Sequence, residues 1–347
     1  MQRYDFKEIE ERVILIGVQT EQDEDVAASL DELEELASTA GAVTVGKVIQ
    51  NREAVHPGTY IGKGKIEEVA ALLAAYDANG IICDDELSPA QMNNLERELD
   101  CKVMDRTLLI LDIFAGRATT SEGKIQVELA QLRYRSARLV GLRESLSRLG
   151  GGIGTRGPGE KKLETDRRLI RTRISALKAE LAQVEKHREL IRGKRSRGNL
   201  KTAAIVGYTN AGKSTLLNTL TGAGILAEDK LFATLDPTTR VLELKEGQQI
   251  LLTDTVGFIR KLPHHLVEAF KSTLEEAKYA DYIIHVVDVS NPQAELQMHT
   301  VYETLRELGA TGKKIITLLN KQDQADGAQI RDLQADYTVK CSARTGE

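Results

Sequence analysis

The sequence predicts an α/β protein in three parts: an N-terminal α/β domain (residues 1–105), a long antiparallel helical hairpin (106–198) and a C-terminal domain (199–347) built on a doubly wound, mostly parallel six-stranded sheet. In the first and third parts, β-rich apolar runs alternate with helical patterns, which is typical of parallel sheets with helical crossovers. The second part carries leucine and isoleucine at three- and four-residue steps, the spacing of amphipathic helices. A phosphate-binding loop pattern follows the first strand of the third part.

The N-terminal domain alternates between four strands and three helices. Strands are expected at 12–19, 42–50, 80–85 and 101–106, and helices at 25–40, 64–78 and 89–99. Ser88 and Pro89 mark the start of the third helix, because serine caps helices and proline suits the first helical position. The three cysteines of the chain form no CxxC pair, which indicates reduced thiols in a cytoplasmic protein.

The hairpin is predicted from two long amphipathic patterns joined by GGGIGTRGPGE (150–160). Glycine tolerates positive φ and the close approach of another backbone, while proline stops a helix. A turn between two helices needs only about 2–8 residues and rarely so much glycine. The segment is therefore either a flexible turn or a functional tip with Arg156 at its centre.

Charge is distributed unevenly along the chain. The formal net charge is −5, yet residues 131–198 contain 19 Lys and Arg against 7 Asp and Glu. A strongly basic segment in an acidic protein favours an anionic partner, although a solvated helix surface is the plainer interpretation. No run approaches the roughly 18 apolar residues of a membrane span, and no basic-then-apolar leader opens the chain. We expect a cytoplasmic monomer without a transmembrane segment; peripheral membrane association stays open.

The C-terminal domain carries six expected strands, at 202–206, 241–245, 249–254, 282–288, 313–320 and 337–343. GYTNAGKS (207–214) lies between the first strand and a helical segment, the context of a phosphate-binding loop. Its glycines let backbone N–H groups face a phosphate chain at a helix N-terminus. Lys213 is expected to reach the β- and γ-phosphates and Ser214 to ligate Mg²⁺. The residues assigned to the nucleotide in this loop are Gly207, Tyr208, Thr209, Asn210, Ala211, Gly212, Lys213, Ser214 and Thr215.

Three further motifs follow expected strands. DTVG (254–257) places Asp254 where a carboxylate holds Mg²⁺ through water, and Gly257 where its N–H meets the γ-phosphate. NKQD (320–323) is a base-reading element, because Asp323 accepts from the two guanine donors that adenine lacks. SAR (342–344) completes the base pocket through the Ala343 N–H. These motifs contribute Asp254, Thr255, Val256, Gly257, Asn320, Lys321, Gln322, Asp323, Ser342, Ala343 and Arg344 to the predicted site.

A segment that senses the γ-phosphate is expected between the phosphate loop and DTVG. LFATLDPTTR (231–240) offers Thr234, Thr238 and Thr239 as the threonine that closes on Mg²⁺. Spacing alone does not choose among the three.

Taken together, GYTNAGKSTL, FATLDPTTR, DTVGFI, NKQD, VMDRTLLILDIFAGRA (103–118) and GIGTRGPGE make essentially the whole chain resemble the HflX family of ribosome-associated GTPases. The resemblance implies GTP hydrolysis with GTP/GDP and Mg²⁺ as ligands. It favours Thr234 as the Mg²⁺ threonine and gives catalytic roles to Lys213, Thr234 and Gly257. The segment FATLD then adds Phe232, Ala233, Thr234, Leu235 and Asp236 to the nucleotide site.

The resemblance also implies a partner. It predicts that the hairpin and its tip dock on the large ribosomal subunit and its ribosomal RNA, and that GTP binding and hydrolysis drive ribosome remodelling, splitting or recycling under stress. Because Tyr134 is the only aromatic residue in 131–198, phosphate and shape contacts should outweigh base stacking. The candidate RNA contacts are Arg156, Lys161, Lys162, Arg167 and Arg168.

Two departures qualify the resemblance. Phe258 stands where Ras-like proteins carry a water-orienting glutamine, so hydrolysis is expected to be slow until a ribosomal partner completes the site. The chain ends at Glu347, directly after the base-binding turn, whereas family members usually continue; whether the chain is truncated at its C-terminal helix stays open.

Two other functions stay open. YIGKGKIEE (60–68) fits the phosphate-loop pattern only loosely, and is either an ATP site or a strand–helix turn. An ATP-dependent RNA remodeller driven by the N-terminal domain is one alternative. A non-catalytic scaffold that presents the hairpin to a protein or an acidic membrane surface is the other.

Overall fold

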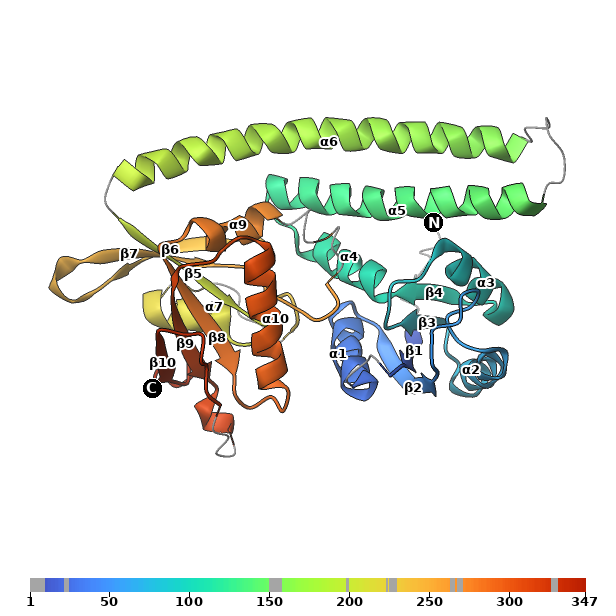
Figure 1. The fold of residues 1–347 in the computed structure, drawn as a ribbon, viewed down its shortest axis with the longest axis horizontal. Coiled ribbons are helices and arrows are strands. Elements are labelled where there is room, and N and C mark those ends of the chain that lie inside the picture. The colour runs from blue at the N-terminus through green and yellow to red at the C-terminus, as the bar shows by residue number, and fades with distance from the viewer. Residues whose placement is uncertain are drawn as a thin grey trace, which may run out of the picture. The chain divides into compact units, whose positions relative to one another are not determined.

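A computed structural model describes residues 10–21, 25–149, 158–197, 200–222, 224, 230–262, 266, 271–325 and 330–347 (Figure 1). The chain divides into two compact units. One comprises residues Met1–Ile113 and Gln131–Arg173, and the other Phe114–Ala130 and Ile174–Glu347. Each unit contains one β-sheet with helices, which confirms the predicted α/β class. The three predicted domain boundaries stay predictions.

The first unit is built on a four-stranded parallel sheet. Its strands are β1 (Arg12–Gln19), β2 (Val43–Asn51), β3 (Gly80–Cys83) and β4 (Lys102–Asp105), in the order β2-β1-β3-β4. The connecting helices are α1 (Val26–Thr39), α2 (Lys63–Tyr76) and α3 (Pro89–Leu99), and α4 (Arg106–Arg117) follows β4. Apolar side chains of the strands, among them Ile14, Ile16 and Ile81, form the core with α2 and α3. The elements follow the predicted order.

Helix α3 begins as its sequence predicts. The Ser88 hydroxyl accepts a hydrogen bond from the Gln91 N–H, and the Gln91 side chain accepts one from the Ser88 N–H. This reciprocal capping box satisfies two backbone donors that no helical carbonyl can reach.

Buried charges occupy the carboxyl ends of β3 and β4. Arg106, only 1% exposed, forms ion pairs with Asp84 (2.7 Å) and with Glu32. Asp105 accepts hydrogen bonds from the Tyr134 hydroxyl (2.8 Å) and from the Arg138 guanidinium (2.5 Å). Because unpaired buried charges are costly, each of these groups needs its partner. The Asp105 bonds hold the long helix of the hairpin against this sheet.

The hairpin consists of α5 (Ser121–Leu149) and α6 (Pro158–Arg197). Glu122, in the first turn of α5, pairs with Arg188 near the end of α6 (2.8 Å), so the two helices run antiparallel, as the sequence predicts (Figure 1). Arg156 and the rest of the glycine-rich connection, 150–157, lie outside the described residues.

The second unit contains the predicted six-stranded sheet. Its strands are β5 (Lys201–Gly207), β6 (Thr238–Glu243), β7 (Gln249–Asp254), β8 (Tyr282–Asp288), β9 (Lys314–Asn320) and β10 (Tyr337–Lys340), in the order β10-β9-β8-β5-β7-β6. All neighbours are parallel except β6 and β7. Helices α7 (Lys213–Thr221), α9 (Lys271–Tyr279) and α10 (Ala294–Glu307) accompany the sheet, with short 3₁₀ turns η1 (Lys245–Gly247) and η2 (Gln322–Gln324).

Most strand limits lie within two residues of those expected, and the two largest differences are three residues. Strand β6 begins at Thr238, three residues earlier than its apolar run, because its polar residues pair with β7 across an antiparallel ladder. Strand β10 ends at Lys340, since the chain then turns back and the Gly346 N–H donates to the Ser342 carbonyl. Among the described helices, none is long and apolar enough to cross a membrane.

Candidate functional site

The carboxyl end of β5 leads into a tight loop that ends in α7. Gly212 caps α7 with a φ of +97°, and a Cβ added there would lie 2.3 Å from the Asn320 amide nitrogen. Only glycine fits this position, because positive φ and close contact both exclude a side chain. Helix α7 therefore starts with its first N–H groups directed at the loop, the arrangement that binds phosphate.

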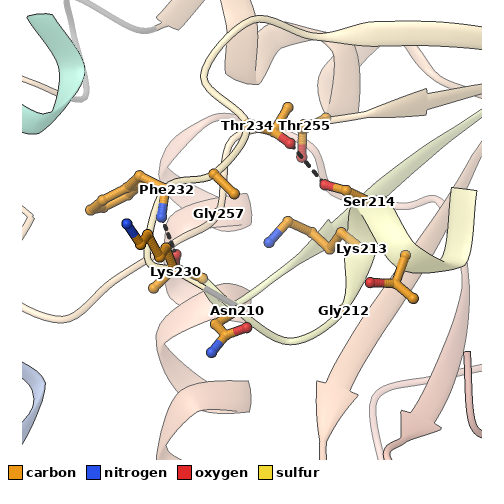
Figure 2. A pocket seen from close by; sticks show the side chains of 12 residues that line it. Asn210, Gly212, Lys213, Ser214, Lys230, Phe232, Thr234, Thr255 and Gly257 are labelled. Carbon is orange, nitrogen blue, oxygen red and sulfur yellow. Dashed lines mark hydrogen bonds between the residues drawn. The ribbon is translucent and has the colours of Figure 1, made fainter. Parts of the chain in front are cut away.

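Lys213 is the first residue of α7, and its side chain lines the cavity beside the loop (Figure 2). Its side chain is 6% exposed, and its ammonium donates a hydrogen bond to the Tyr208 carbonyl (2.8 Å). Burial lowers the pKa of Lys213 to about 8, although the nearby carboxylate of Asp254 opposes that change. A buried positive charge is costly unless a negative charge compensates it, so the Lys213 ammonium favours binding of an anion.

Three oxygen-bearing side chains meet beside Lys213. The Ser214 hydroxyl lies 2.8 Å from the Thr234 hydroxyl and donates to the Asp254 carboxylate (2.7 Å). Asp254 is fully buried, and its other carboxylate oxygen has no hydrogen-bond partner among the described residues. Burial raises the pKa of Asp254, while Lys213 and the Ser214 hydrogen bond oppose the change. Hydroxyl and carboxylate oxygens around an unsatisfied buried atom are donor groups of the kind that suit Mg²⁺.

The segment after β7 packs directly on the phosphate loop. The Phe258 N–H donates to the Gly207 carbonyl, and the Phe258 carbonyl accepts from the Thr209 N–H. A Cβ added at Gly257 would lie 2.7 Å from the Thr209 Cα and 2.9 Å from the Lys213 ammonium. Gly257 thus lets its backbone approach the position where Lys213 would meet phosphate. Thr255 and Val256 are buried, and the Thr255 hydroxyl donates to the Ile205 carbonyl.

Asn320 connects three of the motifs. Its side-chain oxygen accepts from the Ala343 N–H, and its amide donates to the Ala211 carbonyl, both at 2.8 Å. The side chain is 2% exposed, and these two buried hydrogen bonds join it to the phosphate loop and to the last turn. Lys321 has a φ of +63° and pairs with Asp288 (2.7 Å). Gln322 and Asp323 form η2, with Asp323 exposed at the surface.

The last turn lies against α7. The Ala343 carbonyl accepts a hydrogen bond from the Thr219 hydroxyl (2.6 Å), and Ser342 is buried. Arg344 is exposed. The structure thus brings the four motifs to one edge of the sheet, around the loop that follows β5.

The segment between the phosphate loop and β7 places the three candidate threonines differently. Thr234 lies beside Ser214, whereas Thr238 and Thr239 belong to β6, where the Thr239 hydroxyl meets that of Thr253 (3.0 Å). Phe232 and Ala233 line the same cavity as Lys213, and Leu235 is buried. The geometry around Ser214 therefore favours Thr234 as the metal-binding threonine.

No sequence motif predicted two features of the site, which are the place of Lys230 and the partners of the Asp236 carboxylate. Lys230 also lines the cavity and was not among the predicted residues (Figure 2). The Asp236 carboxylate points to Thr119 and Thr120, more than a hundred positions earlier, and not into the cavity. A basic residue just before FATLD was a usable signal for Lys230, but nothing local pairs Asp236 with Thr119.

The hairpin candidates have unequal surroundings. Arg168 is exposed, whereas the Arg167 side chain is 11% exposed and lies 3.9 Å from Glu164. Lys161 and Lys162 belong to α6, but their side chains lie outside the described part of the chain. The loose phosphate-loop match at 60–68 covers the start of α2, where Lys65 pairs with Glu68 (2.7 Å).

Comparison with known proteins covers almost the whole chain. Residues 27–115 match a family described as GTP-binding GTPase N-terminal, 117–195 its middle region, and 202–321 a family described as 50S ribosome-binding GTPase. GTPase HflX of Lacrimispora saccharolytica is 72% identical over 99% of this chain and 81% of its own length. GTPase HflX of Escherichia coli is 45% identical over 97% of this chain and 80% of its own.

Solved structures of GTP-binding proteins are also similar to this chain. A GTP-binding protein from the archaeon Sulfolobus solfataricus, in complex with GDP, is similar at 26% identity with a TM-score of 0.50, over 96% of this chain and 94% of that one. The crystal structure of an SsGBP–GDP complex is similar at 27% identity with a TM-score of 0.53 over the same shares.

Proposed function

The chain belongs to the HflX family of GTPases, and from this premise we propose that its GTP site controls docking of the basic hairpin on the large ribosomal subunit. GTP hydrolysis is the activity of the family, with GTP and GDP as ligands and Mg²⁺ as the typical ion. The proposal adds the partner and the purpose, which is remodelling, splitting or recycling of the ribosome. The GTP-binding part of the proposal rests on the phosphate loop with Lys213, Ser214, Thr234 and Asp254.

Different residues of the site are assigned different roles in GTP binding and hydrolysis. Lys213 binds and neutralises the β- and γ-phosphates from its buried position, because the Tyr208 carbonyl is the one hydrogen-bond acceptor of its ammonium among the described residues. Ser214 and Thr234 would hold Mg²⁺, which would neutralise charge on the phosphate oxygens. Gly257 admits the terminal phosphate next to Lys213.

Guanine selectivity is assigned to Asp323, with Asn320 as its support. Asn320 ties the base-reading segment to the phosphate loop through Ala211 and to the last turn through Ala343. A site of this kind rejects adenine because its polar groups would then lie unpaired.

Hydrolysis by the isolated chain is proposed to be slow. Phe258 is buried, its backbone pairs with the phosphate loop, and its phenyl ring has no polar atom with which to orient a water molecule. A partner must then complete the site, and the large ribosomal subunit is the partner we propose. Purified chain should show a low turnover number that rises at least about tenfold with ribosomes. Equal rates with and without ribosomes would refute this part.

The basic hairpin supports the choice of partner. Residues 131–198 contain 19 basic against 7 acidic side chains, and Arg168, Arg171 and Lys178 are exposed along α6. Leu177, in the same helix, is buried, so the helix has one face toward the protein and another toward solvent. Contacts between such a face and RNA phosphates release counterions and weaken with salt.

A triple variant tests the proposal. Replacing Arg168, Arg171 and Lys178 by glutamine should reduce cosedimentation with large ribosomal subunits about tenfold or more, because each lost phosphate contact weakens binding. Affinity for GDP should stay within twofold of the parent. Cosedimentation that is unchanged would refute the hairpin as the docking element.

A matched control separates local from general charge effects. The variant in which Arg240, Lys245 and Lys314 become glutamine removes the same charge from exposed positions of the second unit. It should cosediment like the parent. Lys213→Ala adds a control for the nucleotide: ATPase activity that survives it would favour an ATP-dependent motor in the N-terminal part.

A further inference from the structure

The segment that carries Thr234 is fastened to the start of the hairpin by the Asp236 carboxylate. The N–H groups of Thr119 and Thr120 donate to Asp236 Oδ2, each at 2.9 Å. The Thr119 hydroxyl donates to Oδ2 (2.7 Å) and the Thr120 hydroxyl to Oδ1 (2.6 Å). Four donors converge on one carboxylate, and hydrogen bonds to a charged acceptor are roughly twice as strong as neutral ones. We call Thr119, Thr120 and Asp236 the carboxylate clasp.

The clasp is also the N-terminal cap of α5. The Thr120 hydroxyl accepts from the Gly123 N–H (2.9 Å) while it donates to Asp236, so one side chain joins the cap to the clasp. The negative charge of Asp236 lies at the positive end of the α5 dipole, where it is stabilised. Burial alone raises the pKa of Asp236, but the hydrogen bonds from the two threonines outweigh it and lower the pKa. Asp236 is therefore held as an anion.

A second contact fixes the other side of Thr234. The Phe232 ring meets the Phe114 ring edge to face, with centroids 4.7 Å apart and planes at 79°. The Phe232 N–H donates to the Thr209 hydroxyl (2.8 Å), and its φ of +54° is unusual for a phenylalanine. Thr234 lies two residues from each contact, so its hydroxyl is restrained from both directions.

We propose that Asp236 is a positioning residue, which through the carboxylate clasp places the Thr234 hydroxyl for Mg²⁺ and so couples GTP binding to the start of α5. By thermodynamic linkage, GTP binding and formation of the clasp must favour each other. GTP with Mg²⁺, which needs Thr234 beside Ser214, stabilises the clasp, and an ordered clasp raises the affinity for GTP. GDP binding does not require Thr234 beside Ser214, so GDP does not stabilise the clasp. The inference depends on the GTPase activity, and not on the identity of the docking partner.

The variant Asp236→Asn tests the inference. Its amide keeps one acceptor oxygen but loses the negative charge and the second acceptor, so the clasp is weakened while the size of the side chain is kept. With Mg²⁺, affinity for a non-hydrolysable GTP analogue should fall about tenfold, the effect of losing a charge-assisted bond, and the Mg²⁺ concentration needed for that binding should rise. GDP affinity should stay within twofold. Equal losses for both nucleotides would overturn the proposal.

A milder variant covers the case in which Asp236→Asn fails to fold. Thr119→Val removes one hydroxyl donor and leaves the α5 cap on Thr120 intact. It should reduce GTP-analogue affinity by about threefold and GDP affinity not at all. No change in the ratio of the two affinities would count against the clasp.

The matched control is a similar carboxylate far from Thr234. Asp281 accepts from the N–H and hydroxyl of Thr202, at 2.9 and 3.0 Å, in the same unit. Asp281→Asn should lower thermal stability without changing the ratio of GTP-analogue to GDP affinity. If it changes that ratio as Asp236→Asn does, the effect is general loosening and the proposal is wrong.

Hydrogen exchange supplies the reverse measurement. The Thr119 and Thr120 amides should exchange more slowly with GTP analogue and Mg²⁺ than with GDP, because Thr234 then holds the clasp closed. Asp236→Asn should abolish that difference. Identical protection in both nucleotide states of the parent protein would overturn the coupling.

Discussion

Replacing Asn320 by alanine removes two hydrogen bonds at once and is the sharpest test of how the site is assembled. The Ala343 N–H and the Ala211 carbonyl each lose a partner at 2.8 Å, and Asn320 is too deeply buried for water to replace it easily. A buried backbone group left unpaired costs about 1–3 kcal/mol, so the two together cost about 2–6 kcal/mol of unfolding free energy. GDP affinity should fall more than about tenfold, since phosphate loop and last turn are no longer joined.

The measurement is urea unfolding followed by circular dichroism, with and without GDP. The transition that GDP shifts belongs to the nucleotide-binding unit, because a ligand stabilises only the part that binds it. Asn291→Ala is the matched control: Asn291 is half-buried and accepts one hydrogen bond, from the Gln293 N–H (2.8 Å), so its loss should cost about 1 kcal/mol or less. If Asn320→Ala costs no more than the control, Asn320 does not connect the motifs energetically.

Two further predictions concern the phosphate end of the site. The pKa of Lys213, about 8 in the free protein, must rise when phosphate binds, so GDP binding should take up about half a proton at pH 8 and weaken as pH increases beyond it; calorimetry in two buffers of different ionisation enthalpy measures this, and proton release would contradict it. Gly257→Ala should reduce GTP-analogue affinity more than about tenfold, because its methyl group would lie 2.7 Å from the Thr209 Cα. Gly116→Ala, where an added methyl meets open space, should bind like the parent; equal affinities for both variants would contradict the steric argument.

Local patterns were sufficient for most elements of the fold. Ser88 and Pro89 predicted the start of α3 because a cap acts within one turn of helix, and the structure confirms it. The phosphate loop and the three later motifs were likewise predictable, since each follows a strand whose carboxyl end lies at the same edge of a parallel sheet.

What the sequence could not provide depends on contacts between distant residues. Thr234, Thr238 and Thr239 are equivalent in spacing; the family resemblance favoured Thr234, and the antiparallel pairing of β6 with β7 is the physical feature that separates them. Asp236 was assigned to the nucleotide because of its neighbours in the chain, yet its carboxylate binds Thr119 and Thr120. Such a pair has no periodicity or motif, because each partner is an ordinary residue in its own segment.

Binding of the chain to purified large ribosomal subunits in each nucleotide state tests the central claim most directly. Cosedimentation with GTP analogue, with GDP and without nucleotide should be compared over a series of salt concentrations. We predict the strongest binding with GTP analogue and a steep loss with salt, in proportion to the phosphates that the hairpin contacts. Binding that is the same in all three states, or that does not respond to salt, would contradict the account.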